Sequence, residues 1–143
     1  PVFAKLSPNV CNLSEIAKAV EAAGADGITA INSVGPGLLI DIKTRKAKLG
    51  AKYGGVTGPA IFPVALRCVN EIYHNVKIPI IGMGGVTIAE DALAMIMAGA
   101  TVVGVGSALY YKGLKVFKEI NDGILDFMKK EKIKSLKEIR GCI

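Results

Sequence analysis

Apolar residues in this sequence fall into short β-branched runs that alternate with stretches of helical periodicity. The runs predict four buried strands, at residues 2–6, 27–31, 78–81 and 101–105. Apolar positions three or four residues apart predict helices from Asn12 or Ser14 to Gly24, from Pro59 to about His74, from Ala89 to Ala98 and from Leu114 to Lys130. Strands that alternate with helices favour an α/β fold with a parallel sheet.

Two stretches fall outside this alternation. Residues 34–53 contain Gly35-Pro36-Gly37 and then alternate between apolar and polar side chains, which predicts a hairpin-like excursion over the strand ends. Residues 135–139 are expected to cap one end of the fold.

Glycines follow two of the predicted strands and suggest a phosphate site. The third strand ends in Gly82-Met83-Gly84-Gly85 and opens a helix, and the fourth ends in Gly104-Val105-Gly106-Ser107 in the same way. Backbone N–H groups at such a turn are free to bind an anion, most often a phosphate. Two successive turns of this kind are typical of the last two strands of a (β/α)8 barrel.

The chain has the length of half such a barrel. The segments Ala23–Ile28 and Ala98–Val103 echo each other, as expected for repeated β/α modules. About four such units fit into 143 residues, whereas a closed barrel needs eight strands and roughly 200 residues or more. We therefore expect residues 1–143 to be the C-terminal half of a TIM barrel that belongs to a longer protein. The alternative is that two copies pair into one barrel.

Composition narrows the function classes. No run reaches 18 apolar residues, so no membrane span is expected. Cys11, Cys68 and Cys142 are far apart and predict neither a metal site nor disulfides, which favours a reducing cytosol. The net charge is +6, but nine of the 18 basic residues lie between Lys112 and Arg140, where they form the polar face of a helix. Nucleic acid is not an expected partner, because aromatic residues do not alternate with these charges in the way that base stacking requires.

Several motifs, taken in order, resemble one family. Together they are similar to the C-terminal half of class 1 dihydroorotate dehydrogenases, and most similar to the NAD-linked 1B branch. The motifs are Lys5-Leu6-Ser7-Pro8-Asn9, Ile31-Asn32-Ser33, Asp41-Ile42-Lys43-Thr44, Gly54-Gly55-Val56-Thr57-Gly58-Pro59-Ala60-Ile61, Ile81-Gly82-Met83-Gly84-Gly85 and Val105-Gly106-Ser107.

The resemblance implies an FMN-dependent oxidation of dihydroorotate to orotate in pyrimidine biosynthesis. It implies that the FMN phosphate is bound by Gly84, Gly85, Gly106 and Ser107, and that Lys5, Ile31 and Gly58 lie at the flavin ring. Asn32 and Ser33 match residues that hydrogen-bond orotate. Asn9 is expected only to cap a turn.

The resemblance also implies that this chain lacks the general base. In the family a Cys or Ser of the preceding half-barrel takes that role, and none of the three cysteines here falls in a matching segment. The sole histidine, His74, is expected to be structural. The implied partners are a second full-length subunit, in a homodimer, and an iron–sulfur/FAD electron-transfer subunit.

Three other functions remain open at this stage. One is a non-redox, phosphate-binding barrel in which Lys5 forms a Schiff base. Another is a flavin domain like that of dihydropyrimidine dehydrogenase, which uses the same barrel. The last is a non-catalytic half-barrel that serves as an assembly module.

Overall fold

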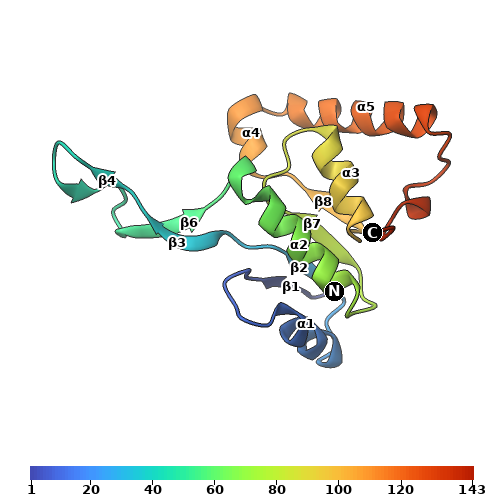
Figure 1. Cartoon of the computed structure of the whole chain (residues 1–143), viewed down its shortest axis with the longest axis horizontal. Coiled ribbons are helices and arrows are strands. Elements are labelled where there is room, and N and C mark those ends of the chain that lie inside the picture. Colours follow the sequence, from blue (N-terminus) through green and yellow to red (C-terminus); the bar gives the residue numbers. More distant parts are fainter.

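The computed structural model describes residues 1–143, and a four-stranded parallel sheet lies at its centre (Figure 1). Its strands are β1 (Phe3–Leu6), β2 (Gly27–Ala30), β7 (Ile80–Met83) and β8 (Val102–Gly104), hydrogen-bonded in the order β1-β2-β7-β8. All three pairings are parallel. The predicted α/β class and the four predicted strands are confirmed.

Helices cover one face of this sheet. They are α1 (Leu13–Ala22), which contacts β1, α2 (Phe62–Tyr73), which contacts β2 and β7, and α3 (Ala89–Met97), which contacts β7 and β8. A short 3-10 turn, η1 (Pro59–Ile61), leads into α2. The core lies between these helices and the sheet, where strand residues such as Leu6, Ile28 and Ile80 pack with Val69 and Met95.

The opposite face of the sheet has no helix on it. Lys5, Thr29, Ile81 and Val102 are in register across the four strands, and strand alternation places them on this face. Phe3 and Val102 remain 41% and 56% exposed. Parallel sheets are normally covered on both sides, so we expect this partly apolar face to pack against additional protein.

Side chains fix the ends of the helices as the sequence predicts. Asn12 caps α1 by accepting the N–H of Glu15 at 3.2 Å, and Gly24 follows the helix with φ of +86°. At the start of α3, the Asp91 carboxylate accepts the N–H groups of Thr87 and Ile88 at 2.8 and 3.2 Å. His74 ends α2, and its Nδ1 lies 2.9 Å from the carbonyl oxygen of Asn70. This contact supports the expected structural role of His74.

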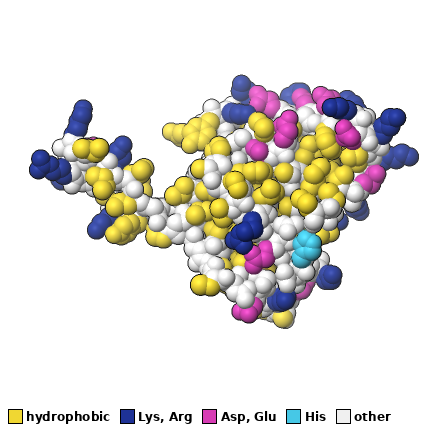
Figure 2. All heavy atoms as spheres, in the orientation of Figure 1, with side chains coloured by type: hydrophobic (Ala, Val, Ile, Leu, Met, Phe, Trp, Pro, Cys, Tyr) yellow, Lys and Arg dark blue, Asp and Glu magenta, His cyan; other side chains and the backbone are white.

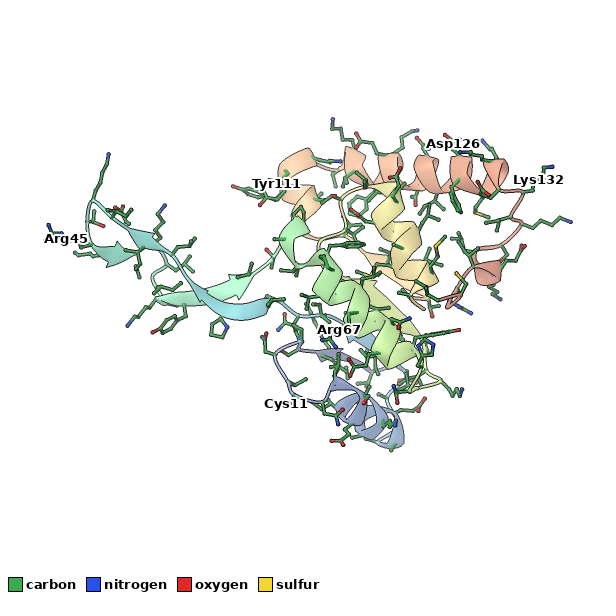
Figure 3. The ribbon with its side chains drawn as sticks, viewed as in Figure 1. Cys11, Arg45, Arg67, Tyr111, Asp126 and Lys132 are labelled. Atoms are coloured by element: carbon green, nitrogen blue, oxygen red, sulfur yellow. The ribbon has the colours of Figure 1, made fainter.

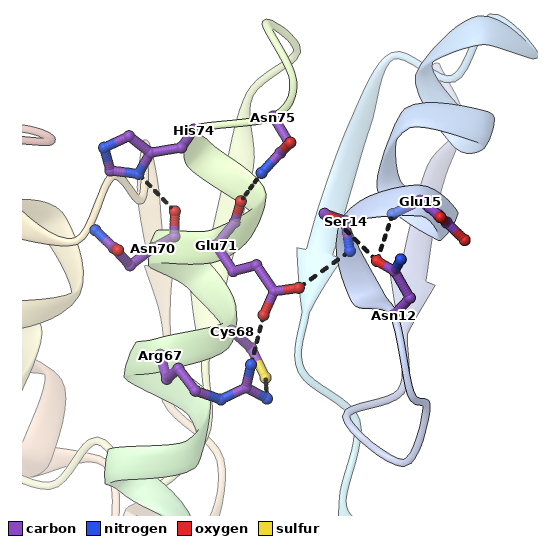
Figure 4. Close-up of polar contacts among 9 residues, drawn as sticks. All are labelled: Asn12, Ser14, Glu15, Arg67, Cys68, Asn70, Glu71, His74 and Asn75. Atoms are coloured by element: carbon purple, nitrogen blue, oxygen red, sulfur yellow. Dashed lines mark hydrogen bonds and ion pairs between the residues drawn. The ribbon is translucent and has the colours of Figure 1, made fainter.

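A polar contact joins α1 to α2 (Figure 4). The Glu71 carboxylate accepts the backbone N–H of Ser14 at 3.2 Å and forms an ion pair with Arg67. Arg67 also donates to the sulfur of Cys68 at 3.2 Å. The contact thus joins two helices that lie on the same face of the sheet.

Residues 34–56 form a two-stranded arm that projects far from the sheet (Figure 1). Strands β3 (Val34–Leu38) and β6 (Tyr53–Val56) are antiparallel, and β4 (Ile40–Asp41) pairs with β5 (Lys46–Ala47) beyond them. Arg45 lies at the tip (Figure 3). Lys and Arg side chains surround exposed apolar ones along the arm (Figure 2). The hairpin predicted from the sequence is confirmed, but it projects away from the sheet and does not fold over the strand ends.

The C-terminal part contains α4 (Ser107–Lys112), α5 (Lys115–Lys130) and a 3-10 turn, η2 (Leu136–Glu138). Helix α5 packs against α3 and buries Val116 and Ile120. Its lysines point to solvent, where Lys118 lies 2.5 Å from Asp122. None of the helices is both long and apolar enough to cross a membrane.

Candidate functional site

A pocket of about 250 Å³ lies at the carboxyl ends of the four parallel strands. It is the place where α/β proteins bind ligands, because loops from several strands converge there. Twelve residues line it: Lys5, Ile31, Asn32, Ser33, Thr57, Gly58, Ile61, Met83, Gly84, Gly85, Gly106 and Ser107.

All nine site residues expected from the sequence line this one pocket. They come from five segments of the chain, from Lys5 to Ser107, so their convergence is a property of the fold. The pocket adds Thr57, Ile61 and Met83, to which the sequence assigned no role. Each of these three lies inside a quoted motif, which is the signal that could have found them.

The two glycines that follow β7 form one wall of the pocket. Gly84 and Gly85 have φ of +130° and +78°, values that only glycine adopts without strain. A Cβ at Gly85 would lie 2.8 Å from the carbonyl oxygen of Gly58, and one at Gly84 would lie 2.7 Å from Ala65 Cβ. These glycines let the turn approach the Gly58 loop closely.

The N–H groups of Gly84, Gly85 and Gly106 donate to no backbone or side-chain acceptor. A Cβ at Gly106 would meet no atom within 4 Å, so the space beside this residue is open. Ser107 adds a hydroxyl at the same edge of the pocket. Unpaired N–H groups around an open space are suited to bind a phosphate.

Lys5 is the only ionisable side chain among the lining residues. It is aligned with Thr29 of β2 on the uncovered face of the sheet, and no carboxylate lies within ion-pair distance of its amine. Its positive charge is therefore free to interact with a bound ligand.

Asn32 and Ser33 leave β2 at the rim of the pocket. The backbone N–H of Asn32 donates to the Leu6 carbonyl at 2.8 Å, and that of Ile31 donates to the Met83 carbonyl at 2.9 Å. The Asn32 amide forms no hydrogen bond within the chain, so its donor and acceptor are free for a ligand.

No cysteine or histidine reaches the pocket. Cys68, on the inner face of α2, is fully buried in the core, and its burial raises the pKa of its thiol; Arg67 lowers this pKa and Glu71 raises it further. Cys11 and Cys142 are exposed elsewhere. The lining thus includes no carboxylate, imidazole or thiol that could act as a general base.

Comparison with known proteins identifies the family. The family model for dihydroorotate dehydrogenase matches residues 1–128. This chain belongs to the dihydroorotate dehydrogenase family.

Curated relatives in this family carry the name dihydroorotate dehydrogenase B (NAD+), catalytic subunit. The chain is 48% identical to the proteins of Methanothermobacter thermautotrophicus and Methanocaldococcus jannaschii over 141 residues, which cover 99% of this chain and 46% and 45% of theirs. It is 48% identical to the Lachnoclostridium phytofermentans protein over 143 residues, or 47% of that protein. The chain thus spans about half the length of these dihydroorotate dehydrogenases.

Proposed function

We propose that this chain is the C-terminal half of an FMN-binding TIM barrel that oxidises dihydroorotate to orotate in pyrimidine biosynthesis. One observation carries the proposal: the nine residues that the family resemblance associates with flavin and orotate gather in one pocket at the carboxyl ends of the strands. The half-barrel itself is supported by the four parallel strands and the uncovered face of the sheet.

The residues at one end of the pocket fit a phosphate. Gly84, Gly85 and Gly106 offer unpaired N–H groups at the pocket, which is open beside Gly106, and Ser107 offers a hydroxyl. In the proposed site these four residues bind the FMN phosphate, since each donated hydrogen bond to an anion is charge-assisted.

The middle of the pocket fits a flat ring. In the proposed site Ile31 and Gly58 contact the flavin ring, and the missing side chain of Gly58 allows the ring to approach the backbone closely. Bound FMN would supply the acceptor for the hydride that leaves a C–H bond of the substrate. Lys5 would place an unpaired cation beside the ring, where it stabilises negative charge.

Asn32 and Ser33 would orient the substrate. An amide presents a donor and an acceptor side by side, as the edge of a pyrimidinedione requires. The base that removes the substrate's proton is proposed to come from the other half of the barrel, where the family resemblance places it, since the pocket's lining has no carboxylate, imidazole or thiol.

The partners follow from the same proposal. The relatives are named catalytic subunits, which supports a second, electron-transferring subunit, proposed here to carry an iron–sulfur cluster and FAD. A homodimer of full-length subunits is proposed as the core of that assembly.

The test uses the full-length protein that contains this chain, loaded with FMN under anaerobic conditions. Dihydroorotate is expected to bleach the flavin absorbance, and Asn32→Ala is expected to raise the required dihydroorotate concentration by about tenfold, as the loss of one or two hydrogen bonds to substrate predicts. Asn70→Ala, on the outer side of α2, serves as the matched control and should behave like wild type.

An FMN-loaded protein that dihydroorotate does not bleach would contradict the proposal. Borohydride trapping of a carbonyl substrate on Lys5, detected by mass spectrometry, would instead support the Schiff-base barrel. A folded full-length protein with neither property would favour the non-catalytic module.

A further inference from the structure

Asn9 lies outside the pocket, in the loop between β1 and α1, yet its side chain reaches a distant segment. Its amide nitrogen donates to the Ser33 carbonyl oxygen at 3.2 Å, and its amide oxygen accepts the N–H of Gly35 at 3.0 Å. These partners are 24 and 26 residues away in sequence. The amide orientation is fixed, because a carbonyl only accepts and an N–H only donates.

The Asn9 amide extends the hydrogen bonding between the first two β/α units beyond the end of β1. The last strand-to-strand bond in this direction runs from the Asn32 N–H to the Leu6 carbonyl at 2.8 Å. Past Leu6 the chain turns away at Ser7-Pro8, and the Asn9 side chain provides the next donor and acceptor in place of a strand. The turn itself is closed by Ser7, whose hydroxyl accepts the Asn9 N–H at 3.2 Å, so Asn9 does more than cap a turn.

Both strands of the arm depend on this contact at their base. Asn9 binds the segment on either side of Val34, where β3 begins. Gly55 of β6 packs directly against Ser33, since a Cβ at Gly55 would lie 2.0 Å from the Ser33 hydroxyl oxygen. From Gly55 the chain runs to Thr57 and Gly58, which also line the pocket.

We propose that Asn9 is a positioning residue, whose amide holds the Asn32–Ser33 segment and the base of the arm in the geometry that binds substrate. This inference rests on the proposed function. Asn9 does not line the pocket, so it acts on the ligand only through Asn32 and Ser33. The phosphate end of the pocket, at Gly84, Gly85 and Gly106, has no contact with it.

The experiment measures orotate and FMN affinities for the FMN-binding full-length protein. Asn9→Ala is expected to raise the orotate dissociation constant about tenfold, as the loss of two hydrogen bonds predicts, and to change the FMN dissociation constant by less than about twofold. The KM for dihydroorotate should rise more than kcat falls, because Asn9 orients the substrate's ligands and not the reacting atoms.

A matched control is present in the same loop. Asn12 caps α1 through Glu15 and contacts no pocket residue. Asn12→Ala should lower the melting temperature and leave the orotate affinity unchanged.

If Asn9→Ala fails to fold, Asn9→Asp tests the same point, because the carboxylate still accepts the Gly35 N–H but cannot donate to the Ser33 carbonyl. Orotate affinity in this variant is expected to improve as the pH falls and the new carboxyl group regains a proton to donate.

The outcomes separate the two proposals. If wild type binds neither FMN nor orotate, the proposed function fails. If wild type binds both, and Asn9→Ala binds orotate as Asn12→Ala does, then only the positioning role is overturned. Equal loss of FMN and orotate in Asn9→Ala would also overturn it, by showing that Asn9 supports the whole fold.

Discussion

Gly85 and Gly106 both line the pocket, but the space around Gly85 is filled and the space around Gly106 is open. Gly85 is buried with φ of +78°, and a Cβ there would lie 2.8 Å from both the Gly58 carbonyl oxygen and Phe62 Cβ. Gly106 has φ of −115°, and a Cβ there would meet nothing within 4 Å. Packing requires a glycine at position 85, whereas at position 106 the surrounding atoms leave room for a side chain.

We therefore expect Gly85→Ala to lower the free energy of unfolding by about 2 kcal/mol or more, through backbone strain and overpacking. Gly106→Ala should change it by less than about 1 kcal/mol. Urea unfolding of the two variants and of wild type makes the comparison. Equal destabilisation by both variants would mean that Gly106 is also required for packing.

The nine residues named from the sequence line one pocket, because each lies in a motif at or just after the end of a strand. Gly84, Gly85 and Gly106 follow β-branched runs directly, and parallel strands bring such ends together. Asn9 shows where this reasoning stops. Its partners are Ser33 and Gly35, and the contact depends on the register between β1 and β2, which no local pattern encodes.

At the scale of elements, the boundaries of most predicted helices and strands agree with the structure to within two residues, because caps and glycines mark them. Helix α2 begins three residues after the predicted Pro59, because the first turn is the 3-10 turn η1, and the sequence predicted no bounds for the short helix α4. The arm was predicted only as a hairpin-like excursion. Its division into β3 and β6 at the base and β4 and β5 at the tip depends on pairing between residues up to 22 positions apart, such as Val34 and Val56.

The arm contributes little to the core. No residue between Val34 and Ile61 belongs to the buried cluster, and Leu39 and Ile42 of the arm are 62% and 86% exposed. It contains five Lys or Arg residues and one Asp, for a net charge of +4. The arm is thus a separate element that is attached to the sheet only at its base.

Replacing residues 38–53 by Asn-Gly should leave the body folded, since Gly37 and Gly54 face each other across the arm and a two-residue turn closes such a pair. The melting temperature of the full-length protein is expected to change by less than about 5 °C, as for the loss of little buried surface. Circular dichroism at rising temperature measures it. A larger fall would show that the arm stabilises the fold or an assembly.

At the scale of the whole molecule, the uncovered face of the sheet is the dominant feature. Strands β1 and β8 are the two edges of the sheet, and the apolar side chains of Phe3 in β1 and Val102 in β8 are exposed. The family match and the relatives' lengths agree with a second half that covers this face. Sequence length alone suggested this, because four β/α units cannot close a barrel.

The proposal as a whole depends on FMN binding to this half of the pocket. The most direct measurement is a fluorescence titration of FMN with the full-length protein and with two matched variants, Gly106→Asp and Gly50→Asp. Both positions are glycines with no atom within 4 Å of an added Cβ, but only Gly106 lines the pocket.

Wild type and Gly50→Asp are expected to quench FMN fluorescence with the same saturating curve. Gly106→Asp should weaken binding by about a hundredfold, because its carboxylate would repel the phosphate at close range. A folded wild-type protein that does not quench FMN, or a Gly106→Asp variant that binds it as wild type does, would contradict the assignment of this pocket to the FMN phosphate.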